Sequence, residues 1–260
     1  MPDAFYLPDG GGRFVATELT RGPWSPAAQH AGPPAALLGR AVERLGDRSD
    51  LHTARVTFEI ARPVPLGTVE VAARRLRGGR SVELVEAILR AAGTEVMRAT
   101  ALRIRTAELP LPGGLAQGPR LPGPERGRQV PFFPTGQEVG YHTAMEVRFV
   151  SGSFLEPGPA TAWMRMRHPL VPGEPPSPLV RVLAAADSGN GVSGALDYRR
   201  WLFVNADLTV YLARPAAGEW VALESATTVA AGVGVADTVL HDEQGPVGRG
   251  LQALLVDHRR

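Results

Sequence analysis

Hydrophobic and polar positions alternate along much of the chain with the two-residue period that is typical of β-strands. Other segments are short continuous apolar runs of strand length. Glycine-containing turns separate several of them, as at Gly93 and Gly245. Tight turns between successive strands predict an antiparallel sheet. The expected strands are 54–61, 69–75, 82–90, 95–104, 142–149, 161–166, 201–212, 220–229, 234–241 and 247–256.

Two segments have helical spacing instead, and each precedes a run of long strands. The first spans 33–45, with proline in its first turn and Gly46 as its stop. In the second, Ser177 is the N-cap, Pro178 opens the helix and Gly189 ends it. Each helix has an apolar stripe that must be buried against a sheet face. The pattern predicts an α+β protein.

An internal repeat relates the two halves. The segment 55–63 contains Thr57 and Ala61-Arg62-Pro63, and the segment 207–215 contains Thr209 and Ala213-Arg214-Pro215 at the same offset of 152 residues. Gly93 and Gly245, and the Ala-Leu pairs that follow Thr100 and Gln252, recur at the same offset. We expect a duplicated unit, with one domain at 1–108, a Pro- and Gly-rich linker at 109–134 and a second domain at 135–260.

Composition narrows the function. The chain has 260 residues and no cysteine, which excludes disulfides, a thiol nucleophile and cysteine metal sites. All 28 basic residues are arginine, yet the net charge is only +2. No dense basic stripe with interleaved aromatics indicates a nucleic-acid surface, and no apolar run is long enough to span a membrane. Without a recognisable secretory signal, we expect a cytoplasmic protein.

The order of helix and strands, together with His30-Ala-Gly-Pro-Pro before the first helix, resembles the double hotdog thioesterases of the acyl-CoA thioesterase II type. The resemblance implies a tandem hotdog fold, each unit a long helix wrapped by an antiparallel sheet. It also implies an Asp–Thr–Gln set in the second unit that holds the hydrolytic water. Asp187 and Gln252 match that set, whereas Asn205 replaces the threonine.

The residues themselves leave two interpretations of this set. Asp187 follows an apolar helical face, where partial desolvation improves a carboxylate as a base; it is otherwise a solvent-facing helix end. Asn205 and Asp207 share one strand face by alternation, and they either act on the hydrolytic water or form hydrogen bonds with nearby backbone or with each other. Gln252 is either a water ligand or a structural amide, and its counterpart at the repeat offset is Thr100.

Substrate contacts are expected at two places. His30, Gly32 and Pro33 lie at the start of the first helix, where amide groups would polarise a thioester carbonyl and Gly32 would permit close approach of the ligand. His30 is otherwise a loop histidine without a task. Arg80 belongs to the short basic run 74–80, which is either a solvated hairpin end or a contact for substrate phosphates.

The resulting hypothesis is hydrolysis of acyl-CoA to a free acid and CoA, with Asp187, Asn205 and Gln252 handling the water and the acyl chain lying between helix and sheet. No cofactor or metal is needed, and the resemblance favours a homodimer. A non-catalytic acyl-CoA or lipid-binding protein is the alternative. A hotdog hydratase is weaker, because such enzymes generally pair Asp with His and no histidine lies near Asp187 or Gln252 in the sequence.

Overall fold

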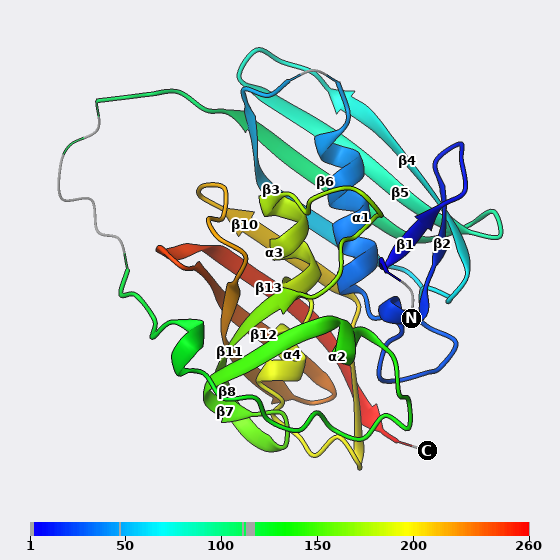
Figure 1. Ribbon diagram of the computed structural model, residues 1–260, viewed down its shortest axis with the longest axis vertical. Helices are drawn as coiled ribbons and strands as arrows, with labels where there is room; N and C mark the ends of the chain where they lie inside the picture. The colour runs from blue at the N-terminus through cyan, green and yellow to red at the C-terminus, as the bar shows by residue number, and fades with distance from the viewer. Residues whose placement is uncertain (1–2, 47, 111, 113–117, 260) are drawn as a thin grey trace.

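The computed structural model describes residues 3–46, 48–110, 112 and 118–259 (Figure 1). In this part of the chain, thirteen strands form one antiparallel sheet in the order β1-β2-β4-β5-β6-β3-β10-β13-β12-β11-β8-β7, with β9 paired to β13. The N-terminal half lies at the top of the view and the C-terminal half at the bottom. The strands are β1 Tyr6–Pro8, β2 Arg13–Ala16, β3 Leu51–Ile60, β4 Thr68–Arg77, β5 Val82–Ala91, β6 Thr94–Arg105, β7 Met145–Ser153, β8 Glu156–Met166, β9 Trp201–Asn205, β10 Asp207–Leu212, β11 Val221–Ala230, β12 Val233–Asp242 and β13 Gly245–His258.

The duplication is visible where the two halves meet. β3 pairs with β10, and Thr57 stands opposite Thr209, its own repeat partner. Their hydroxyl oxygens are 3.3 Å apart. A residue that faces its own equivalent lies on the two-fold axis of a repeat, so this pair marks the approximate axis between the halves.

The repeat offset is not constant along the chain. Thr57 pairs with Thr100 in the first half, and its equivalent Thr209 pairs with Leu251 in the second. Leu251 therefore occupies the place of Thr100, and the equivalent of Gln252 is Ala101. The expected match of Thr100 with Gln252 was wrong by one residue.

Two helices cover the inner face of the sheet. α1 (Gly32–Glu43) and α3 (Pro178–Ala186) lie side by side in Figure 1 and pack on each other. A Cβ on Gly39 would overlap the Leu183 side chain, so glycine permits the close crossing. Ser177 caps α3 by accepting from Val180 N at 3.1 Å, as the sequence predicts. Short helices α2 (Tyr141–Ala144) and α4 (Gly189–Val192) and the 3-10 turns η1 (Glu18–Thr20) and η2 (Pro124–Arg126) complete the elements.

The strand expected at 201–212 is interrupted, and the interruption changes which side chains face inward. Asn205 pairs with Leu254 but Thr209 pairs with Leu251, so four steps along one strand match three along the other. This bulge around Ala206 reverses the alternation. Asn205 therefore points inward while Asp207 accepts the Ala253 N–H at 2.6 Å. The expectation that Asn205 and Asp207 share a face was wrong.

The N-terminal hairpin β1–β2 and helix α2 were not expected from the sequence. Part of the expected linker, residues 111 and 113–117, lies outside the described residues. The later part of the linker is packed: Trp163 Nε1 donates to Pro122 O at 2.8 Å, and Phe133 is buried. The boundaries at 109 and 134 stay a prediction.

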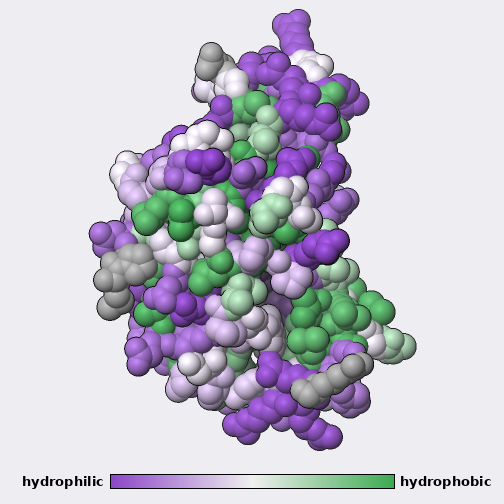
Figure 2. Space-filling view, turned by 90° about the vertical axis from the view of Figure 1, so that its right-hand side faces the viewer, coloured by the Kyte–Doolittle hydropathy of each residue, from purple (hydrophilic) through white to green (hydrophobic). Residues whose placement is uncertain are grey.

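Hydrophobic side chains also reach the surface. Val233, Val235 and Leu255 on β12 and β13 are 59%, 48% and 60% exposed. Figure 2 shows hydrophobic side chains gathered on the lower part of the molecule. Among the described residues, no helix has the length and apolar character needed to cross a membrane.

Candidate active site

Three segments of the second half bring Asp187, Asn205 and Gln252 together. Asp187 is the C-cap residue of α3 and is buried. Asn205 Nδ2 donates to Asp187 Oδ1 at 2.6 Å from the end of β9. Gln252 on β13 donates from Nε2 to Asp187 O at 3.0 Å, with Oδ1 at 3.4 Å. The amides thus contact the carboxylate itself, and the bulge after Asn205 is what turns its side chain inward.

Gln252 joins two helices as well as the carboxylate. Its Oε1 accepts the backbone N–H of Asn190 in α4 at 3.0 Å, while its Nε2 holds the last turn of α3. A Cβ on Gly189 would crowd both Gln252 Oε1 and Thr238 Oγ1, so the chain between α3 and α4 needs glycine there. With both ends of its amide engaged, Gln252 fixes the place of Asp187.

His30 reaches this site from the first half. Its Nδ1 lies 2.9 Å from Asp187 Oδ2, and the Gly32 N–H points at the same nitrogen at 3.1 Å. A ring nitrogen has one in-plane position, so it either donates a proton to Asp187 or accepts from Gly32. The site can therefore hold one proton between Asp187 and His30. No histidine lies near Asp187 in the sequence, but the fold brings His30 to it, so the inference from sequence distance that Asp187 has no histidine partner was wrong.

Tyr141 is a site residue that the sequence did not reveal. Its ring stacks on the His30 imidazole, with centroids 3.8 Å apart and planes 8° from parallel. Its hydroxyl donates to Ala184 O at 2.6 Å and lies 2.9 Å from Ser188 Oγ. Burial raises the pKa of Tyr141 well above its ordinary value, and the nearby Asp187 carboxylate raises that pKa further. The phenol therefore stays neutral and orients the imidazole; a single aromatic residue after a linker carries no sequence signal for this role.

A cavity of about 620 Å³ opens beside these groups. Among the expected site residues, Asp187, Asn205 and His30 line it, and residues of both halves contribute to its wall. This volume is within the usual range of small-molecule sites. Other lining residues include Trp24, Arg62, Phe132, Phe133, Met145, Val147, Phe154, Met164, Asn190, Tyr198, Arg199 and Phe203.

The start of α1 differs from the expected carbonyl-binding site. Pro33 and Pro34 have no N–H, so this helix start lacks two of its usual donors. A Cβ on Gly32 would overlap Ala184 O, so glycine is required here by the approach of α3. Gly32 and Pro33 are buried and are not among the residues that line the cavity.

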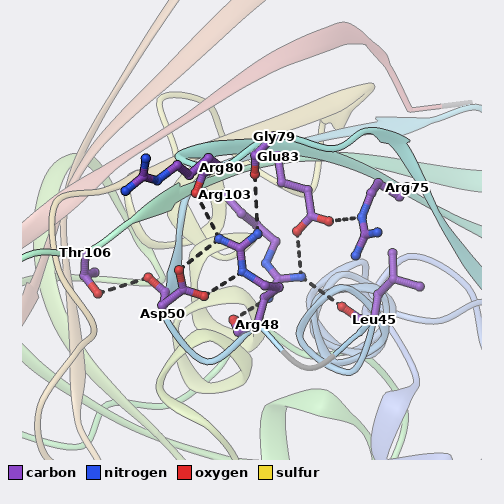
Figure 3. A network of polar contacts seen from close by, with 9 residues as sticks. All are labelled: Leu45, Arg48, Asp50, Arg75, Gly79, Arg80, Glu83, Arg103 and Thr106. Atoms are coloured by element: carbon purple, nitrogen blue, oxygen red, sulfur yellow. Dashed lines mark hydrogen bonds and ion pairs between the residues drawn. The ribbon is translucent and has the colours of Figure 1, made fainter.

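Arg80 lies in the turn between β4 and β5, apart from the cavity, and its carbonyl accepts from Arg48 Nη2 at 3.1 Å. Nothing at this position supports a phosphate contact in the same site. In Figure 3 it lies at the rim of a polar network around Arg103.

The Arg103 network lies in the first half at the position equivalent to that of Asp187, Asn205 and Gln252 in the second half. Thr53 is the equivalent of Asn205, and it pairs with Arg103 as Asn205 pairs with Leu254. Arg103 is buried, donates to Leu45 O and Arg48 O at 3.1 Å each, and lies 3.2 Å from Glu83 Oε2 (Figure 3). The Arg103 guanidinium thus caps the C-terminus of α1. The first half has Thr53 and Ala101 where the second half has the two amides.

In the described residues, no group of three or more His, Asp or Glu side chains is arranged to hold a metal ion. The polar groups beside the cavity are a carboxylate, an imidazole and amides. Such groups can position and deprotonate water or donate hydrogen bonds to a carbonyl.

Two family models match the chain. The acyl-CoA thioesterase N-terminal domain covers residues 20–104, and the acyl-CoA thioesterase C-terminal domain covers residues 124–256. The chain belongs to the acyl-CoA thioesterase family. It is accordingly a thioesterase of the thioesterase II-like type, and its reaction is thioester hydrolysis. A comparison with curated protein sequences found no match.

Solved structures place this thioesterase in the hotdog fold. A proposed thioesterase II from Thermobifida fusca YX is 20% identical with a TM-score of 0.76, covering 97% of this chain and 95% of that one. A hot dog fold protein of unknown function from Alicyclobacillus acidocaldarius is 18% identical, with a TM-score of 0.73 and coverage of 99% and 97%. An acyl-CoA thioesterase II from Mycobacterium marinum is 15% identical, with a TM-score of 0.66 and coverage of 98% and 96%.

Proposed function

We propose that this thioesterase hydrolyses acyl-CoA with a water molecule activated by Asp187. The observation that carries the proposal is the buried Asp187 carboxylate, which lines the cavity with one oxygen held by Asn205 and the other beside His30. A carboxylate fixed in this way is a general base with a defined direction. The acyl-CoA substrate follows from the family.

In the proposed reaction, Asp187 removes a proton from water as the water oxygen attacks the thioester carbonyl carbon. His30 adjoins the carboxylate and can share that proton. Collapse of the tetrahedral intermediate breaks the carbon–sulfur bond, and the departing CoA sulfur takes the proton. The products are a carboxylic acid and CoA, and Asp187 is again a carboxylate. Asn205 and Gln252 act by orienting Asp187 rather than by holding the water between them.

The phosphates of CoA would lie at the mouth of the cavity near Arg62. This arginine belongs to the repeated Ala-Arg-Pro motif, and its equivalent Arg214 is bound to the buried Asp242 carboxylate. Arg62 instead is exposed and lines the cavity. The same motif thus has a structural arginine in one half and an arginine suited to an anionic ligand in the other.

Replacing the base tests the proposal. Asp187→Asn keeps the size of the side chain and removes its basicity, so kcat for thiol release from acyl-CoA should fall by about 10²-fold or more. Asp237→Asn is the matched control, because Asp237 is half exposed and paired with Arg249 on the surface. The control should retain the wild-type rate. Wild-type turnover by Asp187→Asn would overturn the role of Asp187 as base.

Hotdog hydratases generally pair Asp with His, so the Asp187–His30 contact makes the hydratase alternative worth testing. Enoyl-CoA is offered to the wild-type chain, and loss of the conjugated double bond is followed by absorbance. We expect thiol release from saturated acyl-CoA and no hydration of the enoyl group. Hydration faster than thiol release would make the hydratase the better interpretation.

A further inference from the structure

The linker carries aromatic side chains into the cavity. Phe132 and Phe133 stack on each other with ring centroids 4.1 Å apart, and both line the cavity. Phe132 also meets Phe154, in the turn between β7 and β8, edge to face at 4.6 Å, and stacks on His142 at 5.2 Å. Phe154 in turn contacts the fully buried Phe149 at 4.7 Å. Phe132 is therefore packed against the buried core through Phe154, which fixes the position of the Phe132 ring in the cavity wall.

The cavity has both charged and apolar lining. The exposed Arg62 lines it and suits the anionic end of CoA. Met145, Val147 and Met164, on the paired strands β7 and β8, form an apolar part of the lining. Tyr141, stacked on His30, is one helical turn before Met145, so this apolar part begins beside the reacting groups.

Burial also affects His142, which lies against Phe132. The His142 ring stacks on Phe132, and desolvation lowers its pKa. The imidazole is therefore largely neutral at pH 7 and adds a flat ring to the wall. An acyl chain that leaves its carbonyl at Asp187 and enters the apolar part would run towards Phe132.

We propose that Phe132, carried by the linker and backed by Phe154, closes the acyl-binding part of the cavity and limits the length of the acyl group. This inference rests on the proposed function. Phe132 is a specificity-determining residue here, because it sets how many methylene groups can be buried while the carbonyl stays at Asp187. Each further methylene that finds room contributes roughly fourfold in affinity for the apolar pocket.

The experiment measures kcat/KM for thiol release over saturated acyl-CoAs of increasing chain length, in wild type, Phe132→Ala and Phe132→Trp. The readout is the ratio of a long to a short substrate, which is unaffected by the fraction of folded enzyme. Phe132→Ala should raise this ratio by about tenfold or more, since two or more methylenes gain space. Phe132→Trp should lower it, because the larger ring shortens the pocket.

Leu121→Ala is the control for a loosened linker. Leu121 packs against Trp163 and Trp220 on the other side of the sheet, away from the cavity. It should leave the ratio unchanged. An unchanged ratio in both Phe132 variants, or an equal shift in Leu121→Ala, would overturn the proposal.

Failure of the proposed function gives a different result. A wild-type chain that releases no thiol from any acyl-CoA overturns hydrolysis, and the same ratio is then taken from dissociation constants of the same acyl-CoAs. A shift of that binding ratio in Phe132→Ala supports the acyl wall without hydrolysis. An unshifted binding ratio overturns the wall as well.

Discussion

At Asp187, the two carboxylate oxygens have different partners. Oδ1 accepts the short hydrogen bond from Asn205, and Oδ2 faces His30. The threonine that the resemblance implies at position 205 would also have a donor, but its hydroxyl sits one bond closer to the backbone than the Asn205 amide nitrogen. Asparagine therefore keeps the donor function with a longer reach. What matters at position 205 is a donor to the carboxylate.

Substitutions at position 205 test this point. Asn205→Thr should keep kcat within about tenfold of wild type, because the hydroxyl can still donate. Asn205→Leu has similar size and no donor, and should lower kcat by about 10- to 100-fold, the equivalent of one hydrogen bond to a charged group. Steady-state thiol release is the measurement, with thermal melting to confirm folding. Equal rates for the leucine and threonine variants would show that the hydrogen bond is not needed.

Among the elements, the crossing of α1 and α3 sets the position of the site. The close approach of Gly32 to Ala184 brings the last turn of α3, and Asp187 with it, against His30. Gly39 and Leu183 repeat the close approach farther along α1. Asp187 is thus positioned by backbone packing between the halves as well as by its own hydrogen bonds.

Replacing Gly32 or Gly39 with alanine should therefore affect stability and kcat to different extents. Gly32→Ala meets a backbone carbonyl, which moves only with α3, so it should cost about 1–3 kcal/mol of stability and lower kcat as Asp187 shifts. Gly39→Ala meets the end of the flexible Leu183 side chain, so it should be the milder change and leave kcat near wild type. Chemical denaturation and thiol release give both quantities. A greater loss of activity in Gly39→Ala would contradict this order.

Periodicity predicted most helices and strands, because an apolar stripe or an alternating face depends only on residues that are near each other in the sequence. It did not predict the bulge after Asn205, since a bulge depends on the partner strand and a one-residue shift reverses the side-chain faces. Asp187 and Gln252 could be selected from resemblance, yet their hydrogen bonds to each other could not. His30 was selected as a substrate contact, but its pairing with Asp187 could not be predicted, because the packing of α1 on α3 makes it. Tyr141, which stacks on His30, was not selected at all.

In the whole molecule, the halves share both their sheet and their site. β3 and β10 pair along five residue positions at the approximate two-fold axis, and the buried core cluster contains residues of both halves. His30 belongs to the first family domain and Asp187 to the second. The two halves are thus parts of one structural unit, and the division at 109–134 stays a prediction. The expected homodimer stays a prediction.

Heating should accordingly melt the protein in one transition. With about 0.7 kcal/mol per residue near 60 °C, a single unit of 260 residues has an unfolding enthalpy of about 180 kcal/mol, whereas independent halves would each show about half of that. Differential scanning calorimetry gives the calorimetric enthalpy, and the width of the transition gives the van't Hoff enthalpy. The two should agree if unfolding is all-or-none. Thiol-release activity should disappear over the same temperature range, because neither half holds the His30–Asp187 contact alone. Two resolved transitions, or a van't Hoff enthalpy near half the calorimetric value, would show that the halves unfold separately despite the shared sheet.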